Sequence, residues 1–263
     1  MRGLLAALLA EHDAAGMIPT SSRFLFYELV TRGQLSKEKD KSRPPDHIVH
    51  TALTHLREHG HVPWDWIVDE TRALENFTGA ASVHDWITSV LAQARLDPWA
   101  GEPPMVIVES RSLAGTLRSL CDRYAVQLAS TNGQVGGFLH TDIIPQLHGG
   151  ATVLYLGDWD LAGEDIEANT RAVLEHDVGP LHWERVALTE QQVQRYHLPR
   201  ITKKDNRFRP ARTFEAVETE ALSQERITAL LQRRLDQLLP EPLERVLKRE
   251  ARQRKKLKAL LQR

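Results

Sequence analysis

The sequence has one cysteine and no long apolar run. Cys121 is the only cysteine in 263 residues, which excludes an intrachain disulfide and a cysteine zinc cluster and suits a reducing compartment. No apolar run reaches the roughly 18 residues that a membrane-spanning helix needs. The apolar start is interrupted by Glu11, His12 and Asp13, which favours an amphipathic helix over a signal peptide. We therefore expect a cytoplasmic protein with no membrane partner.

A Walker A motif is also missing, so any ATP-driven step would need a separate ATPase subunit. Net charge is close to zero, with 34 Lys and Arg against 35 Asp and Glu. The charge is unevenly distributed, because residues 241–263 contain nine Lys/Arg and three Glu, a surplus of +6. Because the net charge of the whole chain is −1, residues 1–240 carry a net charge of −7. A basic tail on an acidic body indicates a nucleic-acid partner or, alternatively, a solvated basic helix.

The N-terminal part, residues 1–98, has helical patterns followed by an alternating segment. Apolar spacing predicts helices over 3–15, over about 21–33 and over 46–60, with Gly16, Gly33 and Gly60 at their ends. Residues 62–69 alternate well enough to predict a strand or hairpin arm, and 83–95 a further helix. Three helices and a β-arm are typical of a winged-helix, DNA-binding domain; a plain helical cap is the alternative.

The middle of the chain, residues 99–200, alternates strands with helices. Short apolar runs predict strands over 105–108, 125–129, 152–156 and 182–188, and helices over 113–124 and 163–175. This alternation predicts a parallel α/β sheet, whose ligands bind at the carboxyl ends of the strands. Residues 201–263 follow as a basic linker and a helical tail.

Carboxylates stand where two of these strands end. Glu109 directly follows the strand over 105–108, and Asp158 and Asp160 follow the strand over 152–156. Residues i and i+2 of an extended segment point the same way, so Asp158 and Asp160 can face one point, which Glu109 reaches if the strands are neighbours. Gathered carboxylates repel one another, and Mg²⁺ or Mn²⁺ would compensate them. The alternative is that the aspartates are turn residues and Glu109 lies beside a helix cap.

The strand ending in Glu109 and the sequence Asp158-x-Asp160-x-x-Gly163 together resemble the Toprim domain. That resemblance implies an α/β Toprim fold over about 100 residues. It also implies Mg²⁺-assisted breakage or formation of phosphodiester bonds, with Glu109, Asp158 and Asp160 as metal ligands.

A second motif stands before that domain. Arg23-x-x-Phe26-Tyr27 resembles the Arg-x-x-(Phe/Tyr)-Tyr motif of the topoisomerase VI A subunit and its meiotic double-strand-break relative. This resemblance, to the compact mini-A type, implies that Tyr27 attacks DNA and that Arg23 assists it. It also implies a homodimer in which the tyrosine of one subunit works with the metal site of the other. The alternative places Tyr27 in the core, since aromatic and aliphatic residues crowd the same helix.

Further basic residues are candidates for binding the DNA backbone. Arg57 lies on the third predicted helix, and Lys203, Lys204 and Arg207 belong to a basic stretch after the α/β domain. An exposed loop without a DNA role is the alternative for that stretch. The sequence thus predicts Mg²⁺-dependent cleavage of duplex DNA by tyrosine transesterification, with possible resealing. The alternatives are a hydrolytic Toprim nuclease of a mobile-element or defence system, and a DNA-binding protein without catalysis.

Overall fold

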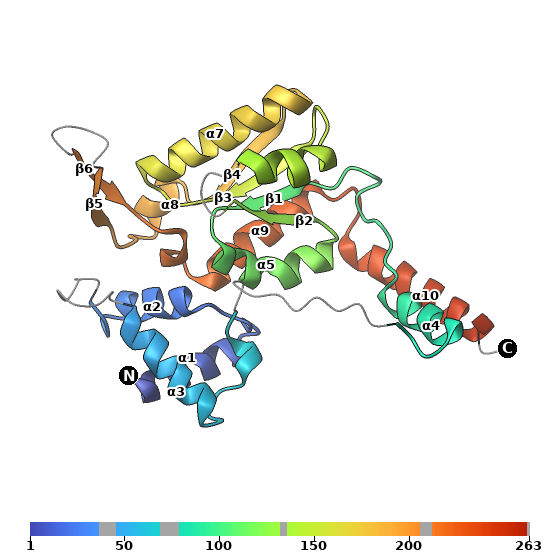
Figure 1. The fold of residues 1–263 in the computed structure, drawn as a ribbon, viewed down its shortest axis with the longest axis horizontal. Helices are drawn as coiled ribbons and strands as arrows, with labels where there is room; N and C mark the ends of the chain where they lie inside the picture. The colour runs from blue at the N-terminus through green and yellow to red at the C-terminus, as the bar shows by residue number, and fades with distance from the viewer. Residues whose placement is uncertain (37–45, 69–78, 132–135, 206–211, 262–263) are drawn as a thin grey trace.

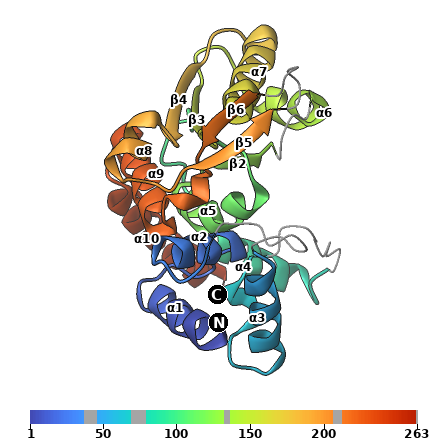
Figure 2. The same cartoon turned by 90° about the vertical axis from the view of Figure 1, so that its left-hand side faces the viewer.

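The computed structural model describes residues 1–36, 46–68, 79–131, 136–205 and 212–261 (Figure 1). Three helices form the N-terminal part: α1 (Arg2–Ala14), α2 (Ser22–Thr31) and α3 (His47–Glu58). The Ser21 side chain caps α2 by accepting a hydrogen bond from the Phe24 amide at 3.2 Å. In both ribbon views α2 is the N-terminal helix nearest the sheet (Figures 1 and 2). The three helices agree with those that the sequence predicts.

The predicted β-arm after α3 is wrong for its described residues. Pro63 lacks an N–H donor, and the chain then makes a single 3₁₀ turn, Trp64–Trp66. Only one isolated bridge follows, between Ile67 and Thr20. Residues 69–78 lie outside the described part, so the winged-helix assignment stays a prediction.

The centre of the fold is a parallel four-stranded sheet, which confirms the predicted α/β class. Its strands are β1 (Met105–Val108), β2 (Gln127–Ser130), β3 (Thr152–Leu156) and β4 (His182–Ala187), in the order β2-β1-β3-β4. The last residues of β1 and β3, Val108 and Leu156, are paired in register. The segments that follow β1 and β3 therefore leave the same edge of the sheet side by side.

Alternate residues of the strands enter two different core layers, as the two-residue period of a strand requires. Val106 and Leu154 belong to the larger apolar cluster, whereas Ile107 and Val153 belong to the smaller one. Helices α5 (Arg111–Tyr124) and α9 (Gln224–Leu238) lie on the first side of the sheet. On the other side lie α7 (Leu161–Val178) and the short helices α6 (Gly136–Phe138), η2 (Leu139–Ile143) and η3 (Ile144–Gln146).

The N-terminal helices share the larger core with the sheet, since Leu5 and Leu25 belong to the same cluster as Leu154. A short helix, α8 (Glu190–Arg195), leads to an antiparallel hairpin of β5 (Ile201–Asp205) and β6 (Arg212–Ala216). The hairpin stands where the sequence suggested a basic linker or loop. A 3₁₀ turn, η4 (Thr219–Ala221), follows and packs against α2.

Two further helices form an arm away from the sheet. Helix α4 (Val83–Gln93) packs on the basic helix α10 (Leu243–Leu261), which confirms a helical tail (Figure 1). The predicted domain limits at residues 98 and 200 stay predictions, although α4 lies with the C-terminal helix. In the described part of the chain, no helix has the length and apolar character to cross a membrane.

Candidate active site

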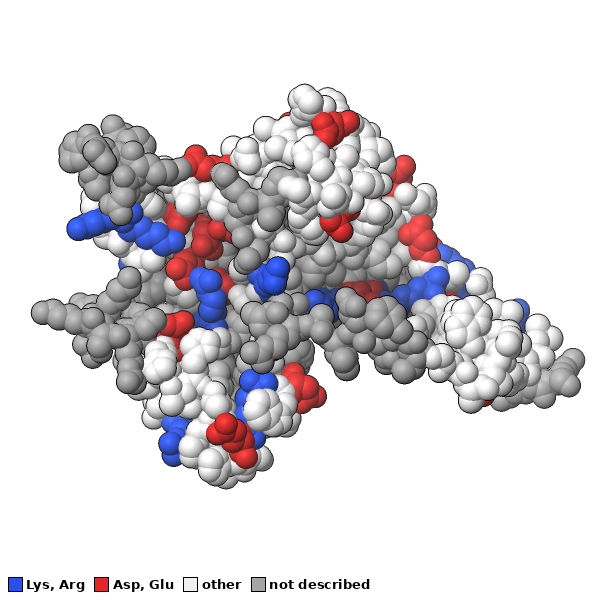
Figure 3. All heavy atoms as spheres, in the orientation of Figure 1, with Lys and Arg blue, Asp and Glu red and all other residues white. Residues whose placement is uncertain are grey.

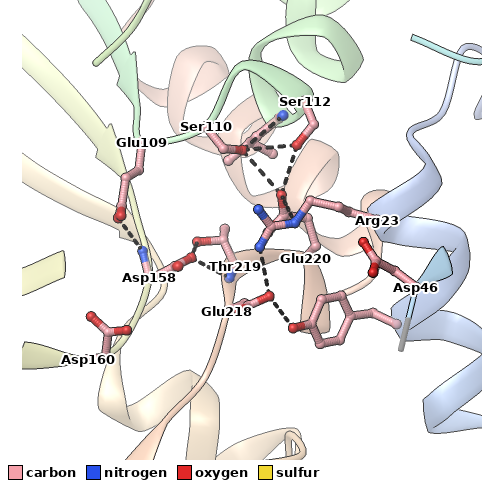
Figure 4. A network of polar contacts seen from close by, with 12 residues as sticks. Arg23, Asp46, Glu109, Ser110, Ser112, Asp158, Asp160, Glu218, Thr219 and Glu220 are labelled. Carbon is pink, nitrogen blue, oxygen red and sulfur yellow. Dashed lines mark hydrogen bonds and ion pairs between the residues drawn. The ribbon is translucent and has the colours of Figure 1, made fainter. Parts of the chain in front are cut away.

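Glu109 and Asp158 meet at the carboxyl ends of β1 and β3. The Glu109 amide continues the sheet by donating to the Leu156 carbonyl at 3.0 Å. Its side chain turns to the neighbouring loop, where Oε2 accepts a hydrogen bond from the Asp158 amide at 2.9 Å (Figure 4). The strand adjacency on which the sequence-based site depended is therefore present.

The Asp158 carboxylate is held from the other side by Thr219. Its Oδ1 accepts hydrogen bonds from the Thr219 amide at 2.8 Å and from the Thr219 hydroxyl at 2.9 Å. Burial and the negative charges of Glu109 and Glu220 raise the pKa of Asp158 to about 7. Burial, followed by the charge of Asp160, raises the pKa of Glu109 as well. Burial and nearby negative charge thus disfavour ionisation of both carboxylates, and a bound cation would offset this cost.

Asp160 has different partners from those of Asp158. One of its oxygens caps α7 by accepting from the Gly163 amide at 2.7 Å, and the other accepts from Lys203 Nζ at 2.6 Å. Among the residues that the structure describes, no three His, Cys, Asp or Glu side chains are grouped so that they could hold a metal ion. The metal-ligand role of the triad stays a prediction.

Gly163 explains the spacing of the aspartate motif. A Cβ atom at this position would lie 2.5 Å from the Asp158 carbonyl oxygen, closer than atoms of this kind approach. Glycine therefore lets the start of α7 pack directly on the Asp158 backbone.

Arg185, on β4, fixes the same loop and was not found by the sequence analysis. Its guanidinium donates to the Gly157 carbonyl at 3.1 Å, to the Asp158 carbonyl, and to the Leu188 carbonyl at 2.8 Å. It also forms an ion pair with Glu167 of α7. The role of Arg185 could not be predicted from the local sequence, because it binds the Gly157 and Asp158 carbonyl oxygens, which belong to a distant segment.

The segment after β6 brings two more carboxylates to the site, and the sequence analysis missed both. Glu218 accepts a hydrogen bond from Arg23 Nη2 at 2.7 Å. Glu220 accepts from the hydroxyl of Ser112 at 3.0 Å and lies 3.4 Å from Arg23 Nε (Figure 4). The signal that could have found them is a pair of acids at i and i+2 after a strand, as in Asp158 and Asp160.

Tyr27 lies against this segment. Its hydroxyl donates a hydrogen bond to Glu218, and the side chain is 5% exposed. Burial and the neighbouring Glu218 raise the pKa of Tyr27 above that of a free phenol. Although burial opposes the shift, the bond from Tyr27 and the charge of Arg23 lower the pKa of Glu218. The pair therefore rests as a neutral phenol and an ionised carboxylate. Arg23 and Tyr27 thus share Glu218 as a hydrogen-bond partner, and the catalytic roles that their motif implies stay a prediction.

The described residues that are predicted to contact DNA do not lie on one common surface patch: one lies within the site and the others lie elsewhere. Half-buried Lys203 lies within the site, between Asp160 and Glu218, whereas Lys204 is exposed on β5. Arg57 donates to the Trp64 carbonyl at 2.8 Å and stacks on its ring. Arg207 lies outside the described residues. DNA contact by these residues stays a prediction.

Overall the site is acidic. Five carboxylates, Glu109, Asp158, Asp160, Glu218 and Glu220, lie around the cations Arg23 and Lys203, and a third cation, Arg185, is paired with Glu167. The acidic groups therefore outnumber the cations. On the face in Figure 3, acidic atoms gather between the β5–β6 hairpin and the N-terminal helices. A phosphodiester would be repelled here unless a cation accompanied it. No protein-family model, curated protein or solved structure matches this chain.

Replacing Glu220 with Ala is expected to lower the free energy of unfolding by about 3 kcal/mol, because it removes the buried acceptor of the Ser110 and Ser112 hydroxyls and one of the two ion-pair partners of Arg23. The Glu220 side chain is only 1% exposed. Urea unfolding measures the loss. The control Glu215→Ala removes a carboxylate that is 56% exposed and pairs with Arg200, and should cost less than about 1 kcal/mol. Equal effects of the two variants would contradict the buried network.

Replacing Asp158 with Asn is expected to stabilise the metal-free protein at about pH 8 by roughly 2 kcal/mol. The folded-state pKa is raised from 3.8 to about 7, so stability is lost as pH rises through this window. An asparagine oxygen still accepts the bonds from Thr219. Thermal unfolding in a chelator should show the difference shrinking toward about pH 4. Asp65→Asn, at an exposed position, is the control. If the stability difference between Asp158→Asn and the wild type does not change with pH, the raised pKa of Asp158 is contradicted.

Proposed function

We propose that the protein cleaves duplex DNA by Mg²⁺-dependent transesterification, with Tyr27 as the nucleophile. The observation that carries the proposal is one network of contacts. Tyr27 and Arg23 both bind Glu218, which adjoins Thr219, the residue that holds Asp158 beside Glu109. Residues of the tyrosine motif and of the Toprim-like motif, far apart in sequence, are thereby close in space. The activity is that of a topoisomerase VI A-like protein.

The donor chemistry of the site fits Mg²⁺ or Mn²⁺. Carboxylate oxygens are the ligands that these ions prefer. The raised pKa values of Asp158 and Glu109 reflect burial and nearby negative charge, both of which a divalent cation would offset. Glu109 and Asp158, with Asp160 next to them, would hold the ion. When bound, the ion would stabilise negative charge on the phosphate and on the leaving oxygen.

The chain's own residues account for the proton transfer. The phenol of Tyr27 stays protonated at neutral pH, so its attack requires a base. Glu218 accepts its hydrogen bond and is placed to take the proton as the bond from Tyr27 Oη to phosphorus forms and the bond from phosphorus to the 3′ oxygen breaks. Arg23, 2.7 Å from Glu218, orients that carboxylate and offsets charge in the transition state.

The contact between Tyr27 and Glu218 lies within one chain, whereas the resemblance implies a tyrosine that serves the partner's metal site. Tyr27 is 5% exposed, so DNA reaches it only after α2 separates from the segment over 218–220. In a homodimer, Tyr27 of each subunit could leave its own Glu218 and contact the carboxylate site of the partner subunit. Each subunit would then cut one of the two DNA strands.

The burial of Tyr27 favours a second candidate function, hydrolysis. In that case Tyr27 only packs and hydrogen-bonds, and water attacks the phosphodiester next to the same carboxylates. The products then carry free ends rather than a phosphotyrosyl bond. A DNA-binding protein without catalysis, the third possibility from the sequence, would yield no cut product.

The test uses purified protein, supercoiled plasmid and Mg²⁺ or Mn²⁺, stopped with detergent and divided into samples with and without protease. We expect nicked or linear DNA that carries protein until protease removes it. Free ends before protease treatment would support hydrolysis, and intact DNA at every metal concentration would contradict both activities. Tyr196→Phe serves as a control, because Tyr196 lies outside the site and stacks on Arg226.

A further inference from the structure

Two adjacent lysines of the β5–β6 hairpin have different surroundings. Lys203 pairs with Phe214 across the hairpin, and Lys204 pairs with Thr213. Successive side chains of a strand point to opposite faces. Lys203 is accordingly half-buried and reaches the carboxylates, whereas Lys204 is exposed to solvent. The strand period therefore directs one lysine of the pair into the site.

An isolated backbone bridge fixes the segment after this hairpin to the loop after β3. The Trp159 amide donates to the Val217 carbonyl at 2.9 Å, and the Val217 amide donates to the Trp159 carbonyl at 2.9 Å. Trp159 stands between Asp158 and Asp160 in the sequence, and Val217 directly precedes Glu218. The bridge thus places the acids of both segments next to the hairpin that carries the lysine.

The Lys203 ammonium lies between two carboxylates. Its Nζ is 2.6 Å from Asp160 Oδ2 and 4.0 Å from Glu218 Oε1. The other oxygen of Asp160 accepts from the Gly163 amide, so both oxygens of this carboxylate have partners. The Asp160 side chain is 3% exposed, and a carboxylate so buried keeps its charge only when it is paired. An ammonium held in this way is poorly placed to follow a DNA backbone.

We propose that Lys203 is the fixed cation of the site and takes the place of a second divalent ion between Asp160 and Glu218. Two carboxylates with water are sufficient to bind Mg²⁺ or Mn²⁺, so the place would otherwise admit an ion. Glu109 and Asp158 would then hold the single ion of the proposed function. Lys203 is a positioning residue, because it acts by offsetting the repulsion between Asp160 and Glu218. The proposal rests on the proposed function, but the two are tested by separate readings.

The test counts the Mn²⁺ ions bound to the full chain without DNA, by calorimetric titration and by electron paramagnetic resonance of the free ion. Lys203→Met removes the charge and keeps most of the apolar stem, and Lys203→Gln is a second neutral variant in case the first does not fold. Lys203→Arg keeps the charge. Lys204→Met, at the adjacent exposed position of the same strand, is the matched control.

We expect the neutral variants of Lys203 to bind one more Mn²⁺ per chain than the wild type. Lys203→Arg and Lys204→Met should bind as many ions as the wild type does. Adding Asp160→Asn to Lys203→Met should remove the extra ion, because asparagine can still cap α7 but carries no charge. An equal count in the neutral variants and the wild type would overturn the proposal, and so would two ions in the wild type.

The wild-type count tests the proposed function separately. One bound ion supports a metal site at Glu109 and Asp158, and none contradicts it. The difference in count between Lys203→Met and the wild type tests the role of Lys203 in either case.

Discussion

Tyr27→Phe should lower the yield of covalent protein–DNA complex by at least about 1000-fold. Phenylalanine lacks the oxygen that forms the bond to phosphorus, and no neighbouring tyrosine binds Glu218 in its place. The ring still fills its site beside Phe26, so the fold loses one hydrogen bond, worth about 1 kcal/mol. Detergent-stopped reactions on end-labelled duplex DNA measure the complex directly.

The control for this prediction is Tyr196→Phe, which should form the complex as the wild type does. A Tyr27→Phe protein that cuts at the wild-type rate and leaves free ends would establish hydrolysis and place Tyr27 among the packing residues. The phenylalanine protein is expected to keep its fold. Thermal unfolding of the variant checks that loss of the complex does not result from unfolding.

Glu109→Gln is expected to lower Mg²⁺-dependent cleavage by at least about 1000-fold under either mechanism. Glutamine keeps an oxygen that can accept from the Asp158 amide, so the loop after β3 should stay in place. It removes one of the negative charges that would hold the ion. Calorimetric titration with Mn²⁺ should show weaker binding than in the wild type.

The matched control is Glu102→Gln, which removes a carboxylate that is 70% exposed and pairs with His148 away from the site. It should leave both cleavage and Mn²⁺ binding unchanged. Full Mg²⁺-dependent cleavage by Glu109→Gln would contradict the role of the strand-end carboxylates, whatever the fate of Tyr27.

Local pattern was sufficient for most of the fold. The apolar run over 105–108 and the one over 152–156 are short, and helices follow both, so parallel strands were the natural prediction. The prediction of a strand over residues 62–68 was wrong. Trp64 and Trp66 alternate with Pro63 and Asp65, which is typical of a strand, but the chain makes a 3₁₀ turn after Pro63. Val62 and Ile67 are buried on either side of this turn, whereas Trp64 is 58% exposed, so the alternation did not reflect a strand.

The sequence indicated the site through two local features: Glu109 and Asp158 follow strands, and Arg23 and Tyr27 form a motif on one helix. Glu109 and Asp158 meet because their strands are neighbours, which the sequence could suggest but not establish. Glu218 and Glu220 come from a segment about 110 residues beyond Glu109, and only the packing of η4 on α2 brings them to Arg23. The i, i+2 spacing of the two acids could mark them as candidates, but their contact with Arg23 could not be predicted locally, because it depends on how distant elements are assembled.

In the proposed mechanism the Tyr27 oxygen bonds to phosphorus next to the carboxylates of the sheet edge. The most direct measurement traps the complex with duplex DNA and Mg²⁺, digests the DNA and the protein, and maps nucleotide-linked peptides by mass spectrometry. We expect a nucleotide attached to the peptide that contains Tyr27. Cut DNA with no nucleotide-linked peptide, or a nucleotide attached to another residue, would contradict it.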